Sequence, residues 1–298
     1  MNDSPLFRPL PGVFEPSAVQ QLADGRFLVV EDEKAYPLSV FRIDPDGAVE
    51  TTALPVDGWE LDDLEGLAAD SAGRLYAITS HSRDGDGDEQ AERNQLLRFR
   101  IDDNALQDVR QTSRFKTALV ATHPVFTDAV AEKDVKGRGG LNVEALEINP
   151  RSGALMVGLR SPVMDGRAVI ITIENPDAVF DQAQAMRIAP ELITLDLGGD
   201  GLRGMAFLTD LNGYLLISGP TAKLKVPFRL WFWRGDASHT PKRVQARETA
   251  CFEHAEGICP AVIDGQAKIV LVSDDGSRKS GRFAQFAILD PQILSMRD

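Results

Sequence analysis

Charged side chains recur at matching points of this 298-residue sequence, most of them directly before a small residue and an aliphatic residue. The repeated positions are Glu15, Glu65, Glu144, Arg203 and Glu256, and Arg203 is the basic member of the set. Carboxylate oxygens are the ligands that hard divalent cations such as Ca²⁺ prefer. We therefore predict that Glu15, Glu65, Glu144 and Glu256 surround Ca²⁺ or another divalent cation.

Polar residues that do not repeat lie close to these positions in the sequence. Asp63 and His254 each stand two residues before a repeated glutamate, and His81 follows an apolar strand. Histidine suits proton transfer because its unperturbed pKa lies near neutral pH. We predict that His254, His81 and Asp63 are the catalytic residues.

A second group of residues suits an anionic part of a substrate. Arginine binds carboxylates and phosphates through charge-assisted hydrogen bonds, and amide or carboxyl groups can orient the rest of a ligand. The predicted substrate-binding residues are Arg160, Arg203, Asn142 and Asp274.

Each repeated position begins the same local pattern, which is a short inner strand, a tight turn and a second apolar strand. The repeats start at residues 15, 65, 144, 203 and 256. About four short antiparallel strands in each interval of roughly 50 to 60 residues are typical of a propeller blade. The sequence predicts an all-β fold with one β-propeller domain over residues 1–298 and five blades. An irregular β-sandwich is the alternative.

The longest interval between repeats and the two ends of the chain depart from the regular four-strand pattern. The second repeat is predicted to have its fourth strand at residues 115–121, followed by an insertion at residues 122–140. Pairing of this insertion as a degenerate blade would give six blades. The last repeat supplies three strands, so residues 7–10 are predicted to complete it and close the ring.

Propeller geometry would bring the candidate residues together. Adjacent strands of a blade are antiparallel, so the start of each inner strand and the end of each second strand lie on the same face of the ring. Several carboxylates so close together cannot all be ionised without partners. Arg160 and Arg203 could neutralise them, a cation could be bound, or one carboxyl could stay protonated and serve as a general acid. A glutamate that recurs in most blades can also be a structural latch.

Composition narrows the classes of partner. The formal net charge is −13, which disfavours binding to nucleic acids. No apolar run approaches the roughly 20 residues of a membrane-spanning helix, and residues 1–5 show no feature of a signal peptide. We expect a cytoplasmic protein without a membrane or nucleic-acid partner.

Three other features are assigned no catalytic role. Cys251 and Cys259 are predicted to be core thiols. The segment Asp84–Asp88 resembles the start of a calcium loop, but Glu89 stands where such a loop has Gly, so we expect a flexible acidic loop. Residues 136–140 are predicted to be a hinge.

Four short motifs together resemble a bacterial β-propeller family known as a domain of unknown function. They are Asp63-Leu64-Glu65-Gly66-Leu67, Asn142-Val143-Glu144-Ala145-Leu146, Val157-Gly158-Leu159-Arg160-Ser161-Pro162 and Ala255-Glu256-Gly257-Ile258. More distantly, the chain is similar to phytase-like and esterase-like propellers. The resemblance covers nearly the whole chain and implies a propeller fold and, by analogy, a hydrolase. Arg203 stands where the family pattern would have Glu, which departs from a symmetric metal ring.

These observations lead to one functional hypothesis and one alternative. The hypothesis is a propeller that binds a small anionic molecule at its central channel and acts as a divalent-metal-dependent hydrolase of phosphoesters, esters or lactones. The alternative is a non-enzymatic ligand-binding or interaction scaffold whose glutamate ring is structural.

Overall fold

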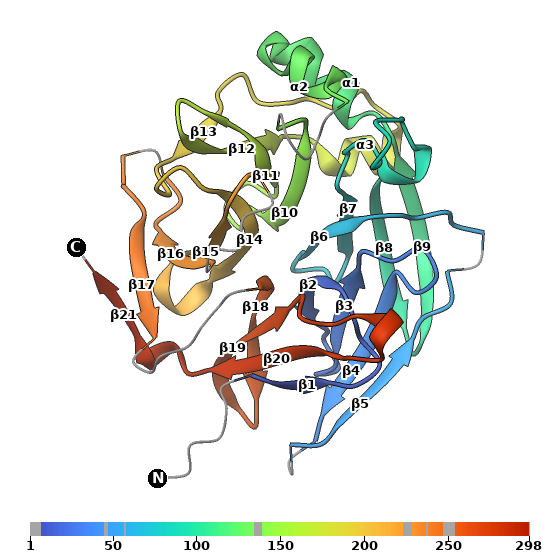
Figure 1. Cartoon of the computed structure of the whole chain (residues 1–298), viewed down its shortest axis with the longest axis vertical. Coiled ribbons are helices and arrows are strands. Elements are labelled where there is room, and N and C mark those ends of the chain that lie inside the picture. Colours follow the sequence, from blue (N-terminus) through green and yellow to red (C-terminus); the bar gives the residue numbers. More distant parts are fainter. Residues whose placement is uncertain are drawn as a thin grey trace.

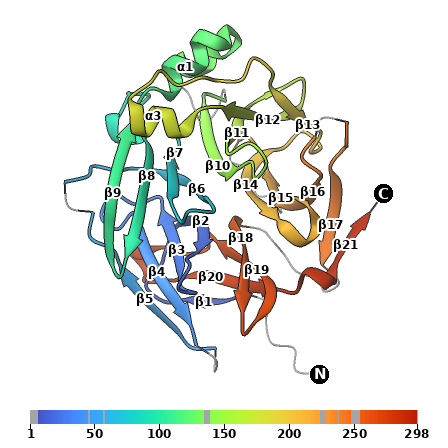
Figure 2. The same cartoon turned by 180° about the vertical axis from the view of Figure 1, so that it is seen from behind.

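Five antiparallel β-sheets surround a central axis like the blades of a propeller (Figure 1). The computed structural model describes residues 7–44, 47–56, 58–133, 139–222, 228–236, 238–246 and 254–297. Seen from behind in Figure 2, the first strand of each blade lies nearest the axis. The predicted five-bladed propeller is therefore confirmed.

The first three blades each contain four strands in chain order from the axis outwards. Blade 1 consists of β2 (Pro16–Gln21), β3 (Phe27–Glu31), β4 (Leu38–Ile43) and β5 (Val49–Ala53). Blade 2 consists of β6 (Leu64–Ala69), β7 (Leu75–Thr79), β8 (Leu96–Asp102) and β9 (Ala105–Thr112). Blade 3 consists of β10 (Asn142–Ile148), β11 (Leu155–Met164), β12 (Arg167–Ile173) and β13 (Ile193–Leu195).

The last two blades are both completed by segments distant in the sequence. Blade 4 consists of β14 (Gly201–Leu208), β15 (Gly213–Gly219), β16 (Arg229–Trp233), β17 (Lys242–Ala246) and the C-terminal β21 (Leu294–Arg297). Blade 5 consists of β18 (Ala255–Ile263), β19 (Gln266–Ser273), β20 (Ala284–Leu289) and β1 (Arg8–Leu10). The predicted closure by an N-terminal strand is confirmed, because β1 pairs with β20. The fifth strand of blade 4 was not predicted.

Helices lie at the outer edge of the ring, next to blades 2 and 3 (Figure 1). They are α1 (Phe115–Thr122), α2 (Thr127–Ala131) and α3 (Pro176–Gln182). Short 3₁₀ turns are η1 (Ala91–Arg93), η2 (Pro124–Phe126), η3 (Thr209–Leu211), η4 (Arg278–Ser280) and η5 (Pro291–Ile293). No helix in the described ranges is long and apolar enough to span a membrane.

The predicted fourth strand at residues 115–121 is wrong, because this segment forms α1. Phe115 and Leu119 are both fully buried, and a spacing of four residues puts them on the same face of a helix. They pack in the core between blades 2 and 3. The fourth strand of blade 2 is β9, a mostly exposed outer strand that the apolar pattern did not reveal.

Every inner strand carries a β-bulge at the same level, where one extra residue interrupts the pairing with the second strand. The register shifts place Ser17, Glu65, Glu144, Arg203 and Glu256 in the bulges. The predicted repeat start at Glu15 is therefore wrong by two residues. Blade 1 has Ser17 where blades 2, 3 and 5 have glutamate, and the nearby Glu15 concealed this difference in the sequence.

A small residue follows each bulge because the inner strands approach one another closely at the axis. A Cβ atom on Gly204 would lie 2.4 Å from the carbonyl oxygen of Glu256 in the next blade. A Cβ atom on Gly257 would lie 2.9 Å from the Cα atom of Ala18. These neighbours are backbone atoms that cannot rotate away. The small residue after the bulge is thus a steric requirement of the ring at these positions.

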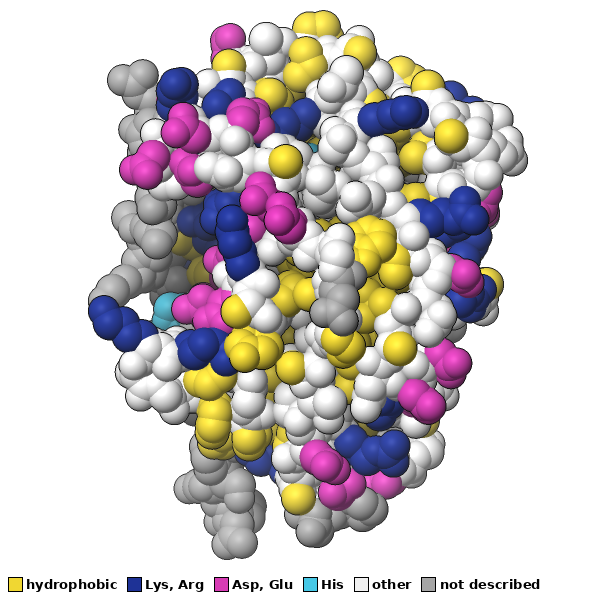
Figure 3. Space-filling view, turned by 90° about the vertical axis from the view of Figure 1, so that its right-hand side faces the viewer, with side chains coloured by type: hydrophobic (Ala, Val, Ile, Leu, Met, Phe, Trp, Pro, Cys, Tyr) yellow, Lys and Arg dark blue, Asp and Glu magenta, His cyan; other side chains and the backbone are white. Residues whose placement is uncertain are grey.

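The outer surface carries charges of both signs. Figure 3 shows Asp and Glu side chains interspersed with Lys and Arg side chains around hydrophobic ones on one side of the molecule. Although the net charge is −13, this side of the molecule is therefore not uniformly acidic.

Substitution of Gly204 by Ala should strongly destabilise the propeller, because the new methyl group would collide with the backbone of blade 5. We expect a loss of about 2 kcal/mol or more in the free energy of unfolding, measured by urea denaturation. The control is Asp210→Ala on an exposed turn of the same blade, which should change the value by less than about 0.5 kcal/mol. Equal stabilities for the two variants would contradict the steric argument.

Candidate functional site

The candidate site lies at the end of the channel where the inner strands begin and the second strands end. Below this mouth, the inner strands leave a cavity of ≈10 Å³, lined in part by Ser17, Glu65, Glu144 and Glu256. A volume of this size holds about one water molecule. The channel is therefore too narrow for a substrate, and any ligand larger than an ion must bind at the mouth.

A buried ion-pair chain joins blades 3, 4 and 5 across the channel. Arg203 Nη1 lies 2.8 Å from Glu144 Oε2 and 3.2 Å from Glu256 Oε1. Its Nη2 donates to the carbonyl oxygen of Pro220 at 3.0 Å, and its guanidinium lies 4.7 Å from the centre of the Phe228 ring. Arg203 is only 6% exposed and Glu144 only 4%. The basic member of the repeat thus neutralises two of the glutamates.

Arg160 and Asn142 contact the same glutamate from the mouth side. Arg160 Nη1 donates to Glu144 Oε1 at 2.9 Å, and Asn142 Nδ2 donates to that oxygen at 3.2 Å. Within the described residues, Arg160 Nε and Asn142 Oδ1 are buried and have no hydrogen-bond partner. Both side chains therefore have polar atoms that a ligand could use.

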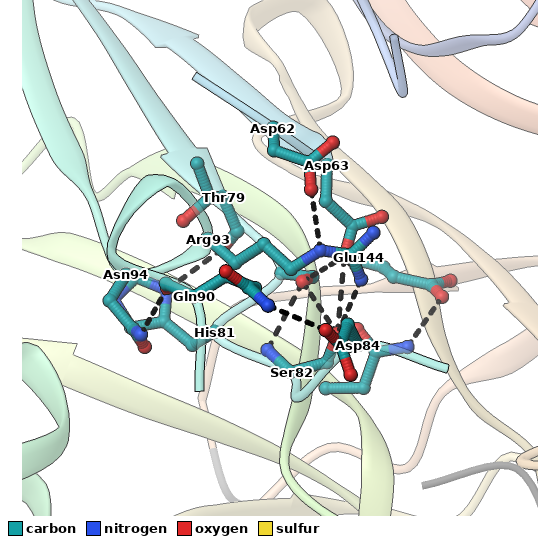
Figure 4. A network of polar contacts seen from close by, with 12 residues as sticks. Asp62, Asp63, Thr79, His81, Ser82, Asp84, Gln90, Arg93, Asn94 and Glu144 are labelled. Carbon is teal, nitrogen blue, oxygen red and sulfur yellow. Dashed lines mark hydrogen bonds and ion pairs between the residues drawn. The ribbon is translucent and has the colours of Figure 1, made fainter. Parts of the chain in front are cut away.

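Asp63 is held by a network of donors from its own blade (Figure 4). Its Oδ2 accepts from the hydroxyl of Ser80, from the hydroxyl of Ser82 at 3.1 Å and from Arg93 Nη1 at 2.9 Å. Arg93 Nε also donates to Asp62 Oδ2 at 2.7 Å. Asp63 has a φ of 63°, an uncommon left-handed conformation that this network maintains.

Arg93 and Asp62 were not among the predicted site residues. Arg93 ends η1 in the polar segment between β7 and β8, and nothing in a single sequence distinguishes it from other loop arginines. Asp62 stands directly before Asp63, so the acidic pair Asp62-Asp63 was the available signal.

Three carboxyl groups from blades 1 and 2 could hold a metal ion. One ligand oxygen each from Asp32, Asp63 and Glu65 lie within 4.8 Å of one another. Burial, the charge of Glu144 and then the charges of Asp63 and Asp32 raise the pKa of Glu65 well above its usual range. Partial desolvation at the mouth and the charge of Asp63 raise the pKa of Asp32. These groups repel one another, so the site favours a proton or a cation.

The four predicted metal ligands therefore do not lie together in one site. Glu65 belongs to this acidic group, whereas Glu144 and Glu256 contact Arg203. Glu15 is not in the axial position, and its carbonyl oxygen accepts from the backbone N–H of Asp32 at 3.0 Å. Burial and the charge of Glu33 raise the pKa of the Glu15 carboxyl, and Arg278 opposes this rise.

His254 and Asp274 lie at the mouth on blade 5. The backbone N–H of Asp274 donates to the carbonyl oxygen of His254 at 2.8 Å. The His254 side chain is 51% exposed, its Nε2 is 3.9 Å from Asp275 Oδ1, and its ring centre is 6.3 Å from that of Phe228. Burial and the charge of Glu15 raise the pKa of Asp274 to about 6. Phe228 connects this histidine to the Arg203 cluster.

His81 is placed differently from the other predicted catalytic residues. Its ring packs edge-on against Phe115 of α1 at 4.9 Å, and Nδ1 lies 2.8 Å from the carbonyl oxygen of Thr79. Figure 4 shows it on the side of Thr79 and Asn94, away from Glu144. Burial lowers its pKa to about 4, so the ring is neutral near pH 7. This position is that of a core histidine beneath α1.

The remaining sequence features are consistent with structural roles. Asp84 Oδ1 accepts from the backbone N–H groups of Asp86 and Asp88, both at 2.9 Å, so the acidic loop is closed by its own hydrogen bonds. Cys259 is a fully buried free thiol, and burial raises its pKa to about 12. Cys251 and residues 136–138 of the predicted hinge lie outside the described residues.

Comparisons with known proteins identify a family and several distant structural neighbours. The model of a family described as "Protein of unknown function (DUF3616)" matches residues 88–289, which is more than half of the chain. A comparison with curated proteins gives no match.

Solved structures similar to the chain include three of different origin. A putative oxidoreductase (glucose dehydrogenase) from Thermus thermophilus is 14% identical, with 95% of this chain and 99% of that chain covered and a TM-score of 0.47. The PQQ-bound aldose sugar dehydrogenase from Streptomyces coelicolor is 16% identical, with 95% and 98% covered and a TM-score of 0.46. The allergen Mala s 1 from Malassezia sympodialis is 12% identical, with 97% and 83% covered and a TM-score of 0.46. Similarity at this level does not indicate a function.

Substitution of Glu256 by Gln should change how stability depends on pH. Burial outweighs the attraction of Arg203 and, together with the charge of Glu144, raises the pKa of Glu256 to about 8. The folded-state pKa of Glu256 lies above its unfolded value. The contribution of its protonated carboxyl group to stability is therefore complete at low pH and is lost as the pH rises towards 8. The wild-type protein should therefore lose stability relative to Glu256→Gln between about pH 5 and pH 8.

Urea denaturation at several pH values measures this difference. The matched control is Glu191→Gln on the surface, whose stability should follow that of the wild-type protein across the range. Parallel curves for the wild-type protein and Glu256→Gln would show that burial does not raise the pKa of this carboxyl.

Proposed function

The chain belongs to the family described as protein of unknown function DUF3616, and we propose that the mouth of its channel binds a small anionic molecule together with a divalent cation. In this proposal, the protein hydrolyses phosphoesters, esters or lactones at this mouth. The observation that carries the proposal is the guanidinium of Arg160, which is fixed at the mouth but has unused donors.

Arg160 is suited to an anion because one interaction holds it while its other N–H groups remain available. A guanidinium has five N–H donors in a planar fork. Within the described residues, Nη1 of Arg160 contacts Glu144, whereas Nε is buried without a partner. A buried donor without a partner costs free energy until a ligand satisfies it. A phosphate or carboxylate oxygen would supply the missing acceptor.

The distribution of charge at the mouth supports a ligand that has both an anionic group and a cation next to it. Asp32, Asp63 and Glu65 lie on the side of blades 1 and 2, whereas Arg160 and Arg203 belong to blades 3 and 4. A cation among the carboxyl groups would compensate their charge, and an anionic ligand would contact it from the side of the arginines. The ligand would then join the two halves of the mouth.

Hydrolysis at such a site needs a group that moves protons as well as one that holds the substrate. A bound divalent cation polarises a phosphoryl or carbonyl oxygen and lowers the pKa of a bound water molecule. His254 is half exposed at the same mouth, so it can donate a proton to the leaving oxygen as the ester or lactone bond breaks. Arg160 would orient the anionic group, and water would supply the new oxygen.

The alternative is a non-enzymatic scaffold, and one observation favours it. The chain of Glu144, Arg203 and Glu256 joins three blades, and its members are mostly buried. This arrangement is explained by its structural effect alone. In the alternative, the mouth binds a ligand or a partner without changing it.

Substitution of Arg160 by Met should weaken binding of inorganic phosphate, used as a simple anionic probe, because the fork of N–H donors is lost. We expect at least a roughly tenfold rise in Kd by isothermal titration calorimetry. Arg160→Lys should bind with intermediate affinity, since it retains the charge but not the planar fork. The control is Arg187→Met, which removes an exposed arginine with one long ion pair. An unchanged Kd for Arg160→Met in a protein that melts cooperatively would contradict the proposal.

Substitution of His254 by Ala tests the enzymatic version directly. A panel of phosphomonoesters, carboxylic esters and lactones is assayed with the full chain and Ca²⁺ or Mg²⁺. For the best substrate, we expect kcat to fall about 100-fold with little change in KM. His239→Ala is the matched control, because His239 is equally half exposed and pairs with Asp236 outside the mouth. Hydrolysis of none of the substrates by the wild-type protein would favour the scaffold, and equal activities of His254→Ala and wild type would refute the role of His254.

A further inference from the structure

We infer that the cation of the proposed function is a single Ca²⁺ ion bound away from the axis by Asp32, Asp63 and Glu65, and not by the repeated glutamates of the channel. The three residues come from two adjacent blades. Asp32 follows β3 of blade 1, Asp63 directly precedes β6 of blade 2, and Glu65 occupies the bulge of β6. The inference rests on the proposed function only for the role of the ion, and its test needs no substrate.

Glu65 provides the observation that distinguishes this group from an ordinary acidic cluster. It is 8% exposed, and no hydrogen bond or ion pair joins its carboxyl group to any residue of the described ranges. The other buried carboxyl groups of the described residues have hydrogen-bond or ion-pair partners. Glu144 contacts two arginines, and Glu31 accepts from the backbone N–H of Phe14 at 2.9 Å. Buried polar groups almost always have a partner, so the Glu65 carboxyl group needs a proton, a water molecule or a cation. Of these, a cation would also compensate the charges of Asp63 and Asp32.

Asp63 is already oriented as a metal ligand would be. The donors from Ser80, Ser82 and Arg93 all bind Oδ2, which leaves Oδ1 without a hydroxyl or N–H donor among the described residues. Outer hydrogen bonds of this kind fix the direction of a ligand and are a regular part of metal sites. The uncommon φ of 63° at Asp63 is a further constraint on the direction of its side chain.

The chemistry and number of the ligand groups favour Ca²⁺ over other divalent cations. The group contains carboxyl oxygens without histidine or cysteine, which is unlike a typical zinc site. Ca²⁺ binds directly to several carboxylate oxygens in a flexible geometry, whereas Mg²⁺ keeps several water ligands and is usually held by one or two carboxylates. Three carboxyl groups thus suit Ca²⁺, and exposed Asp32 leaves room for water ligands.

The remaining channel glutamates have other partners. Arg203 lies between Glu144 and Glu256, and Arg160 contacts Glu144 from the mouth. A metal ion between Glu144 and Glu256 would face the guanidinium groups of Arg203 and Arg160. An ion among Asp32, Asp63 and Glu65 would face one guanidinium group, that of Arg93. The cation is therefore expected to lie beside Glu65, on the side of blades 1 and 2.

Calcium binding by the chelator-treated full chain tests this inference. Isothermal titration calorimetry should show one Ca²⁺ per chain, and Ca²⁺ should raise the melting temperature. Glu65→Gln and Asp63→Asn should each weaken binding at least about tenfold, since loss of a ligand should cost no less than loss of its outer partners. Glu256→Gln is the matched control, because it changes a channel glutamate that contacts Arg203, and its Kd should stay within about threefold of wild type.

Each outcome of this experiment supports or refutes the site. Absence of calcium binding by the wild-type protein overturns the inference, and so does an equal loss of affinity in Glu65→Gln and Glu256→Gln, which would indicate an axial ring. If Glu65→Gln folds, its metal-free form should melt higher than metal-free wild type, because one of the mutually repelling carboxyl groups is gone. Arg160→Met should still bind Ca²⁺. Loss of phosphate binding with intact calcium binding would therefore refute the anion site alone.

Discussion

The close approach of five inner strands at one axis is the constraint on which the rest of this structure depends. The strands come so near that a Cβ atom on Gly204 would collide with the backbone of the next blade. Each strand bulges at this level and turns one side chain into the channel. Ring closure therefore decides both where small residues are required and where charged residues meet. The position of the site, at the level of these bulges, follows from a steric requirement.

Charged side chains that converge at the axis repel one another, and their charges are compensated differently on the two sides of the ring. On the side of blades 3 to 5, Arg203 compensates Glu144 and Glu256. On the side of blades 1 and 2, Glu65 lies near Asp63 and Asp32, and Arg93 reaches Asp63 from outside the group. Replacement of one glutamate by arginine thus divides a pseudosymmetric channel into a neutralised half and an acidic half. This asymmetry is the feature on which the proposed cation and anion sites depend.

The repeat could be recognised in the sequence because most blades have a small residue at the same point of the inner strand. Glu65, Glu144 and Glu256 each precede a small residue, and this pattern was enough to predict five blades and the convergence of their first strands. Blade 1 was placed two residues too early because Ser17 has no charge that marks the bulge. Residues 115–121 were predicted as a strand because an apolar run does not reveal whether its packing repeats every two residues or every four. Arg93 could not be predicted, since its partners become neighbours only after blade 2 has folded.

Pairing of β1 with β20 has a consequence for how this chain must fold. Residues 8–10 pair with residues 284–286, so the contact that closes the ring has nearly the largest sequence separation that the chain permits. Contacts of such high contact order form slowly, because a long loop must be ordered first. During synthesis, blades 2 and 3 and the first four strands of blade 4 can form while β1 still lacks its partner β20. Until β20 leaves the ribosome, β1 is an unpaired strand, and unpaired strands are where β-proteins associate with other chains.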